Sequence, residues 1–237
     1  MCDDHPTPFL RRSLLAASAA SLVAGGSAAP SLAQAQVAAP PNAITPDEAL
    51  KRIMEGNARY VANAPHNKDF SAGRMARAAA QYPIAALVSC ADARVGPELV
   101  FDQEPGELFV VRVAGNFVNT DLLASLEYGV KILNVPLIMV LGHSGCGAIA
   151  ATIKVMKEKT ELPGHLPDLV NAIKPAIDLA EKSKAADPFG EAIAQNVRYN
   201  VRRLQEAKPI VADFVASNKV KVVGGVYDIA TGKVALL

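Results

Sequence analysis

The sequence predicts an α/β fold: a single domain with a mainly parallel β-sheet flanked by helices, and a last short strand that runs antiparallel at the edge. Two observations support this prediction. Apolar runs such as PIAALVSC and PLIMVLG alternate with longer segments of helical spacing, which is the order of strand–helix–strand units. These runs also lack polar alternation, as expected of strands that are covered on both faces.

The first helix of this domain has a clear start. The segment TPDEALKRIMEGNARYV begins with Thr45 as the expected N-cap, Pro46 in the first helical position and Glu48 closing a capping box. A polar loop is expected to follow, from about residue 63 to residue 71.

Four apolar runs are the predicted buried strands. PIAALVSC ends at Cys90, ELFVVRV covers residues 107–113, PLIMVLG covers residues 136–142, and VKVVGGVYD lies near the C-terminus. After an ATG turn, KVALL is the predicted antiparallel edge strand.

Helices are predicted between these strands. TDLLASLEYGVKILN places Leu122, Leu126 and Val130 at helical spacing, and AIAATIKVMKEK follows the third strand directly. From residue 166 to about residue 217 the pattern is helical, with a break at Asp187-Pro188.

The first 35 residues have the layout of a secretory signal peptide. Arg11 and Arg12 precede an Ala-rich apolar run, and the sequence Ala33-Gln34-Ala35 fits a signal-peptidase site. The paired arginines and the weak hydrophobicity favour twin-arginine export, so we expect cleavage near Ala35 and a periplasmic protein. The apolar run is short for a bilayer-spanning helix, so no stable membrane span is expected after cleavage.

Residues 36–44 are predicted to be a linker, and residues 45–237 form the predicted domain. Lys and Arg number 24 against 23 Asp and Glu, which gives no electrostatic reason to expect nucleic acid or an anionic membrane as a partner. The chain has no Trp and few aromatic residues, which argues against a base-stacking or sugar-binding surface.

Chemically active side chains follow two of the predicted strands. LVSCADARVG places Cys90, Asp92 and Arg94 after one strand, and GHSGCGA places His143 and Cys146 after another, at the start of a helix. Ligands collect outside the carboxyl ends of parallel strands. Two thiols, one imidazole and one carboxylate are ligands that zinc accepts in a tetrahedral set.

Three other interpretations of these residues compete with zinc binding. A lone Cys at a strand end is usually a small core hydrophobe, Cys90 and Cys146 could form a disulfide, and the glycines around Cys146 could hold phosphate at the helix N-terminus. The glycine spacing matches neither a dinucleotide-binding motif nor a P-loop, and a disulfide leaves His143, Asp92 and Arg94 without a role. Four candidate ligands in two motifs therefore favour a metal.

At these residues the chain resembles the β-class carbonic anhydrases. That family carries C-x-D-x-R after one strand and H-x-x-C after a later one, which stand here as CADAR and HSGC. Further segments resemble the family in the same order: FDQEPGELFVVRVAGN, SLEYGV, VPLIMVLGHSGCGA and VVGGVYDIATGKV. The resemblance covers essentially residues 45–237.

The resemblance implies that Cys90, His143 and Cys146 bind Zn²⁺. Asp92 would then either pair with Arg94 or, in a closed form, occupy the fourth coordination position. The reaction implied is the reversible hydration of carbon dioxide to bicarbonate and a proton, by attack of zinc-bound hydroxide. The presence of Gln81, Phe109 and Tyr128, which match family positions near the site, leads us to expect the open, water-bound form as the resting state.

The resemblance also assigns a substrate pocket and an assembly. Gln81 would help to hold substrate, and Phe109 and Tyr128 would line the pocket. Ala93 stands where many members have Ser, which removes a hydroxyl near the site without touching the zinc ligands. Family members are dimers or larger, so a homo-oligomer is expected.

Two rival functions share these residues. The same zinc frame could act on carbon disulfide or carbonyl sulfide, and access to the pocket would decide between these substrates and carbon dioxide. A non-catalytic zinc protein is the second rival, although a purely structural site has no use for the Asp92–Arg94 pair.

Overall fold

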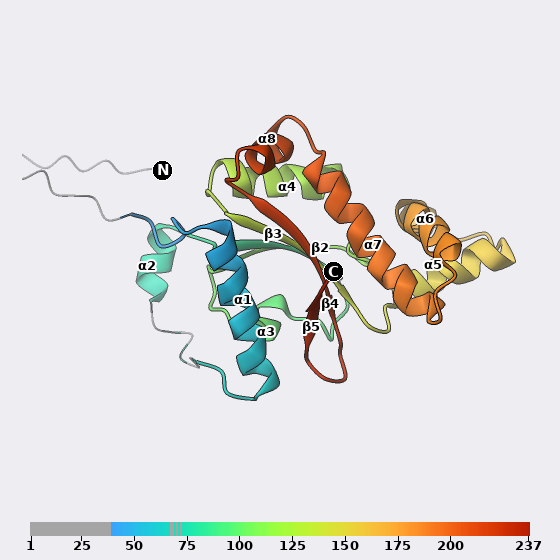
Figure 1. Cartoon of the computed structure of the whole chain (residues 1–237), viewed down its shortest axis with the longest axis horizontal. Coiled ribbons are helices and arrows are strands. Elements are labelled where there is room, and N and C mark those ends of the chain that lie inside the picture. The colour runs from blue at the N-terminus through green and yellow to red at the C-terminus, as the bar shows by residue number, and fades with distance from the viewer. Residues whose placement is uncertain (1–38, 67–68, 70, 72) are drawn as a thin grey trace, which may run out of the picture. The chain divides into compact units, whose positions relative to one another are not determined.

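A five-stranded β-sheet forms the centre of the computed structural model, which describes residues 39–66, 69, 71 and 73–237 (Figure 1). Its strands are β1 (Ala85–Ser89), β2 (Leu108–Arg112), β3 (Leu137–His143), β4 (Lys221–Tyr227) and β5 (Val234–Leu236). They lie in the order β2-β1-β3-β4-β5, and every neighbouring pair is parallel except β4 and β5. The predicted fold class, with its antiparallel edge strand, is confirmed.

Helices connect and cover the strands. They are α1 (Pro46–Val61), α2 (Arg74–Ala79), α3 (Pro97–Val100), α4 (Thr120–Lys131), α5 (Gly147–Glu158), α6 (Leu166–Ser183), α7 (Pro188–Gln205) and α8 (Ile210–Ala216). The helical segment after residue 166 breaks at Asp187, as predicted, and again before α8, which the periodicity did not indicate. The short helices α2 and α3 were not predicted either, because six and four residues are too few to establish a helical period.

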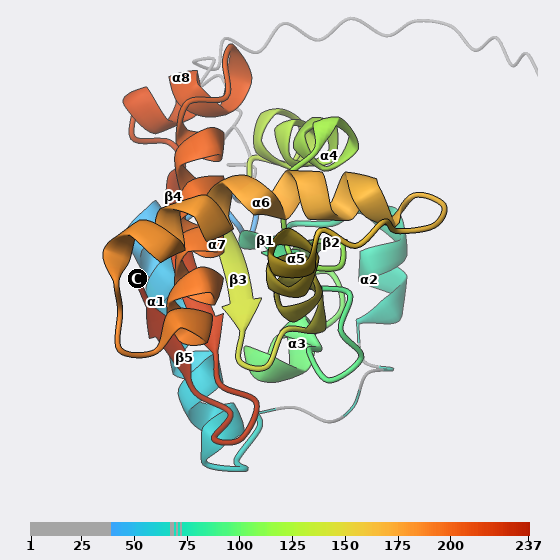
Figure 2. The same cartoon turned by 90° about the vertical axis from the view of Figure 1, so that its right-hand side faces the viewer.

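Both faces of the sheet are covered, because successive side chains of β1 point to opposite faces and pack against different helices. Leu87 packs into a core cluster with residues of α1 and α3, whereas Ala86 and Val88 pack into a second cluster with α4, α7 and α8. Figures 1 and 2 show these two groups of helices on either side of the strands. All five residues of β1 are buried, which explains the uninterrupted apolar run in the sequence.

The first described residues form hydrogen bonds with segments that lead into the sheet. Thr45 caps α1, since its hydroxyl oxygen accepts a hydrogen bond from the N–H of Glu48 at 3.1 Å. Just before it, the buried Asn42 side chain donates to the carbonyls of Pro83 and Leu133, at 3.2 and 2.7 Å. The packed unit therefore begins at residue 39, inside the segment expected to be a linker.

The expected signal peptide, with Arg11, Arg12 and a cleavage site near Ala35, lies outside the described residues. Among the helices that the structure describes, none combines the length and the hydropathy needed to cross a membrane.

Gly56 allows α1 to approach α3 closely, and this contact yields a stability prediction. A Cβ at position 56 would lie 1.8 Å from the carbonyl oxygen of Phe101, which is backbone and cannot rotate away. We expect Gly56→Ala to lower the free energy of unfolding by about 1–3 kcal/mol through overpacking. The measurement is urea denaturation followed by circular dichroism.

Gly129 in α4 is the matched control. A Cβ there would meet Phe109 at 3.4 Å, an ordinary contact, so Gly129→Ala should retain or gain up to about 1 kcal/mol from its better helix propensity. If Gly56→Ala is as stable as Gly129→Ala, the close packing of α1 on α3 is wrong.

Candidate metal centre

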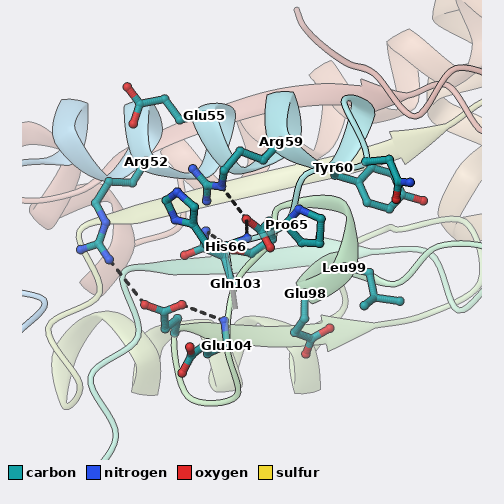
Figure 3. A pocket seen from close by; sticks show the side chains of 13 residues that line it. Arg52, Glu55, Arg59, Tyr60, Pro65, His66, Glu98, Leu99, Gln103 and Glu104 are labelled. Atoms are coloured by element: carbon teal, nitrogen blue, oxygen red, sulfur yellow. Dashed lines mark hydrogen bonds and ion pairs between the residues drawn. The ribbon is translucent and has the colours of Figure 1, made fainter. Parts of the chain in front are cut away.

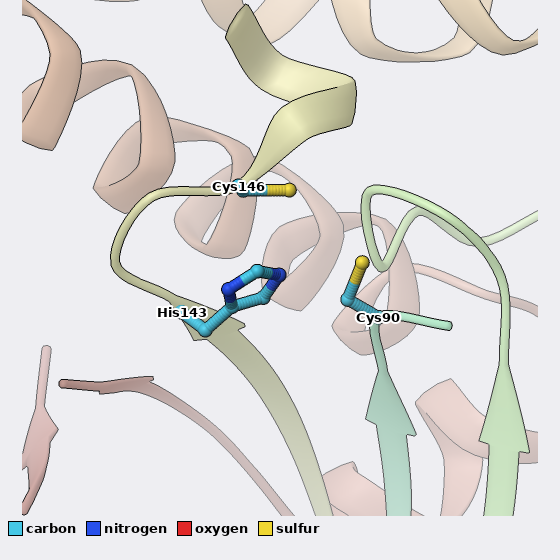
Figure 4. Close-up of side chains that lie close together, drawn as sticks. All are labelled: Cys90, His143 and Cys146. Carbon is cyan, nitrogen blue, oxygen red and sulfur yellow. The ribbon is translucent and has the colours of Figure 1, made fainter. Parts of the chain in front are cut away.

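Two adjacent strand ends bring the predicted ligands together. β1 and β3 pair in parallel with Ser89 opposite Leu141, so Cys90, which follows β1, emerges beside the end of β3. His143 is the last residue of β3, and Cys146 is the N-cap of α5. Figure 4 shows the two sulfur atoms and the imidazole ring directed into the same space. The convergence expected from parallel strands is therefore present.

The cluster is compact and buried. One ligand atom each from Cys90, His143 and Cys146 can be chosen so that all three lie within 4.8 Å of one another. The exposed fractions of these residues are 3%, 0% and 1%. Both cysteines are free thiols, so the structure does not form the disulfide considered from the sequence.

The imidazole is oriented for metal binding. Nδ1 of His143 lies 3.0 Å from the backbone carbonyl oxygen of Ser144, to which it donates when it carries the proton. That tautomer leaves the lone pair of Nε2 free, and Nε2 is buried with no hydrogen-bond partner among the described residues. A buried nitrogen without a partner is costly in a folded protein, and a metal ion would satisfy it.

The two thiols differ in their readiness to ionise. Interaction with the Cys146 thiol lowers the pKa of Cys90 to about 4. The same interaction raises the pKa of Cys146, although the N–H groups of Ile149 and Ala148 at the start of α5 act in the opposite direction. Two thiols in contact resist a double negative charge, so both become thiolates only with a cation between them. The donor set therefore fits zinc, with one open position for substrate chemistry.

Asp92 borders the cluster and is held by Arg94. Its two carboxylate oxygens accept hydrogen bonds from Nε and Nη2 of Arg94 at 2.9 and 2.7 Å, and Arg94 Nη2 also reaches the carbonyl oxygen of Gly145 at 3.3 Å. The hydrogen bonds from Arg94 hold the pKa of Asp92 well below its ordinary value, so the carboxylate is ionised at neutral pH. Oδ2 of Asp92 lies 3.9 Å from Nε2 of His143, which places a fixed negative charge beside the ligands.

Burial lowers the pKa of His143, but the nearby Cys90 thiolate and the Asp92 carboxylate raise it by more. The ring therefore sits in a negative environment, which also attracts a metal cation.

Arg112 is a supporting residue that the sequence analysis missed. Its guanidinium donates to the backbone carbonyls of Cys90, Asp92 and Val95 at 3.0, 2.8 and 2.8 Å, so it fixes the turn that carries both a ligand and the acid. In the sequence Arg112 is only a charged residue near the end of an apolar run. No spacing rule connects it with the turn after Cys90.

The three predicted pocket residues do not lie at the cluster within one chain. Phe109 pairs with Ala86, four residues before Cys90, which is roughly 13 Å along the strand. The ring of Tyr128 lies 6.3 Å from that of Phe109, and Gln81 precedes β1. All three are therefore set toward the amino ends of β1 and β2, whereas the ligands are at the carboxyl ends.

A separate cavity of about 700 Å³ lies between α1 and the chain from α3 to β2 (Figure 3). It is lined by charged residues that pair with one another, including Arg52 with Glu107 and Arg59 with Asp102. His66 lies on its wall, where its backbone N–H donates to Asp102. The cavity contains none of the metal-ligand candidates.

Comparison with known proteins decides the family. The family model described as carbonic anhydrase matches residues 85–234, which include all three cluster residues and the Asp92–Arg94 pair. The chain is 39% identical to a carbonic anhydrase of Mycolicibacterium smegmatis over 192 residues, covering 81% of this chain and 93% of the relative. It is 36% identical to carbonic anhydrase 2 of Mycobacterium tuberculosis over 194 residues, covering 81% and 92%.

Solved structures specify the class. The β-carbonic anhydrase of Coccomyxa, solved in complex with acetazolamide, superposes with a TM-score of 0.64 at 31% identity, covering 79% of this chain and 86% of that one. The β-carbonic anhydrase CcaA superposes with a TM-score of 0.62 at 25% identity, covering 80% and 87%. The chain belongs to the β-class carbonic anhydrases. Membership of this carbonic anhydrase family supports hydration of carbon dioxide as its activity.

The ligand assignment in this carbonic anhydrase leads to a test by substitution. Cys146→Ser replaces a thiolate with a hydroxyl that zinc binds poorly, so we expect the variant to lose its zinc on gel filtration while wild type keeps about one ion per chain. Metal analysis by mass spectrometry provides the measurement.

Ser144→Ala is the matched control in the same turn. The hydroxyl of Ser144 accepts from the N–H of Ile229 at 3.0 Å and does not belong to the cluster, so this variant should keep its zinc. Full zinc content in Cys146→Ser would remove Cys146 from the ligand set.

Proposed function

We propose that Cys90, His143 and Cys146 hold Zn²⁺ and that the chain uses it to hydrate carbon dioxide reversibly to bicarbonate and a proton. The observation that carries this proposal is the buried cluster of two thiols and one imidazole beside an ionised carboxylate. When bound, zinc supplies a hydroxide nucleophile at neutral pH, because it lowers the pKa of a coordinated water from 15.7 to about 7.

Asp92 has the role of orienting the nucleophile. Oδ1 of Asp92 accepts from both the backbone N–H and Nε of Arg94, whereas Oδ2 accepts only from Nη2 and keeps an acceptor site. Asp92 can therefore accept a hydrogen bond from the attacking oxygen at Oδ2. This bond directs a lone pair of that oxygen toward the carbon atom of carbon dioxide. Arg94 bonds to both carboxylate oxygens, which favours the open form in which Asp92 is not a metal ligand.

Asp92→Asn tests this role. The amide has the same size but no negative charge, so we expect the hydration rate to fall at least about 100-fold while zinc stays bound. The rate is measured by stopped flow with a pH indicator, and the metal by mass spectrometry. Asp168→Asn, at an exposed position whose side chain is 84% accessible, should change neither value. Near-normal turnover in Asp92→Asn would show that Asp92 takes no part in the reaction.

We further propose that the chain acts as a homodimer or larger assembly, because its pocket residues and its ligands lie at opposite ends of one sheet. Strand β2 offers the means of pairing. Its carbonyls at Glu107 and Val113 bond to the β1 side, so the backbone groups of Leu108, Val110 and Arg112 point to the open edge.

A second copy can pair with this edge in antiparallel orientation. Centred on Val110, the pairing would place Leu108 opposite Arg112 of the second copy, next to the turn that Arg112 holds. Phe109 and Tyr128 of each copy would then approach the ligand cluster of the other. Exposure of Tyr128 and Ile132 on α4, at 48% and 59%, is consistent with a further contact there.

Val110→Lys tests this arrangement. Two lysines meeting at the symmetry centre should give monomers in sedimentation velocity, with hydration strongly reduced and zinc still bound. Ala235→Lys on the opposite edge strand β5 is the control and should leave assembly and activity intact. A zinc-loaded monomer that hydrates carbon dioxide at the wild-type rate would contradict the shared pocket.

We also propose that residues 1–35 direct twin-arginine export and that the mature protein is periplasmic. Folding in the cytoplasm would allow Cys90 and Cys146 to bind zinc before they meet an oxidising compartment. The support is the sequence pattern at Arg11-Arg12 and Ala33-Gln34-Ala35.

Replacing Arg11-Arg12 with Lys-Lys should leave folded, zinc-loaded precursor in the cytoplasm. Cell fractionation, with zinc and free thiols measured in each pool, is the test. Export of the Lys-Lys variant at the wild-type level would refute the twin-arginine route without affecting the metal centre.

A further inference from the structure

Two buried asparagines on α7 bond to the loop that contacts Cys90, one of the three candidate ligands. Asn196 and Asn200 are 1% and 0% exposed and lie one helical turn apart. Nδ2 of Asn196 donates to the carbonyl oxygen of Gly115 at 2.8 Å, and Oδ1 of Asn200 accepts from the N–H of Val118 at 2.9 Å. The two asparagines therefore form hydrogen bonds at both ends of the loop from Gly115 to Val118.

The two side chains fix each other. Nδ2 of Asn200 donates to the backbone oxygen of Asn196 at 2.8 Å and lies 3.3 Å from its Oδ1. Oδ1 of Asn196 thus has the Asn200 amide as its partner, and an amide buried without partners costs on the order of 1–3 kcal/mol. With its Oδ1 directed at Asn200, Asn196 turns its Nδ2 toward Gly115.

Gly115 connects this pair to a predicted zinc ligand. Its N–H donates to Sγ of Cys90 at 3.2 Å, and this bond also lowers the pKa of that thiol. Its backbone has a φ of +85°, and a Cβ at this position would lie 2.5 Å from Cδ1 of Ile173, so only glycine fits. The next residue, Asn116, has a φ of +41°. Glycine and asparagine are the residues that adopt positive φ most readily, so the local shape of the loop suits its sequence. The bonds from Asn196 and to Asn200 add the tertiary contacts that fix where the loop lies.

We propose that Asn196 is a positioning residue, which through Gly115 holds the N–H···S hydrogen bond on Cys90 and so sets the affinity of the site for zinc. The inference rests on the zinc site of the proposed function. Hydrogen bonds to a metal-bound thiolate orient the ligand and tune its donation, and losing such an outer-shell partner typically costs about 10- to 100-fold in metal affinity. Six elements lie between β1 and α7, which carries Asn196, so no sequence motif joins it to Cys90.

Asn57 provides a matched control for the loss of a buried asparagine. It is 4% exposed, its Nδ2 donates to the carbonyls of Val100 and Gly232, and its Oδ1 accepts from the N–H of Val234. Asn57→Ala should therefore lower global stability through the same chemistry as Asn196→Ala. It bonds to none of the cluster residues.

The experiment compares wild type, Asn196→Ala and Asn57→Ala by two readouts. Zinc affinity is measured by competition with a chelator, and the thiolate-to-metal charge-transfer band is recorded after substitution with Co²⁺. We expect Asn196→Ala to bind zinc about 10-fold or more weakly and to shift the band, with Asn57→Ala like wild type in both. If Asn196→Ala fails to fold, Asn196→Ser is used, since its shorter side chain cannot reach Gly115 and carries the same expectation.

Two outcomes would overturn the proposal. One is wild-type zinc affinity and an unshifted band in the Asn196 variant, and the other is an equal loss of affinity in Asn57→Ala, which would mean that general destabilisation is the cause. A wild-type protein that binds no zinc would instead refute the proposed function itself.

Discussion

Two thiols and an imidazole are held inside the protein with their ligand atoms within 4.8 Å of one another, and the surrounding structure serves to keep them there. Cys90, His143 and Cys146 are all nearly inaccessible to solvent, and Nε2 of His143 has no protein partner among the described residues. In water-excluded surroundings such a group of donors is unfavourable unless a cation joins them. The parallel pairing of β1 with β3 and the start of α5 impose the arrangement, and the surrounding hydrogen bonds maintain it.

Most of the hydrogen bonds that hold the cluster in place involve backbone N–H or carbonyl groups. Arg112 bonds to three carbonyls of the turn after β1, Ser144 accepts from the imidazole, and Gly115 donates to a sulfur atom. Each contact fixes the direction of a ligand or of the adjoining acid instead of adding a ligand. This explains how a small cluster at the ends of two strands and the start of one helix can retain a geometry that fits a metal ion.

The candidate ligands and the Asp92–Arg94 ion pair could be predicted from the sequence because each motif is local. Cys90 and His143 sit at the ends of strands whose apolar runs are unmistakable, and parallel topology then requires those ends to meet. Arg112, Asn196 and Asn200 could not be found in this way, since their partners are backbone atoms far along the chain. The side chains involved are ordinary components of a strand and of an amphipathic helix.

The predicted pocket residues could be assigned by type from the sequence, but their position relative to the ligands could not. Gln81, Phe109 and Tyr128 were assigned by resemblance alone, and the parallel strands carry them away from the ligands of their own chain. A motif specifies residue types but not the copy of the chain that supplies them. The short helices α2 and α3 were not predicted for a simpler reason, because six and four residues are too few to establish a helical period.

X-ray absorption at the zinc edge of the purified protein is the decisive experiment for the proposal that Cys90, His143 and Cys146 bind zinc. We expect about one zinc per chain with two sulfur ligands near 2.3 Å and the remaining nitrogen or oxygen ligands at about 2.0–2.1 Å. A shell of nitrogen and oxygen ligands without sulfur, or a protein that contains no zinc, would contradict it.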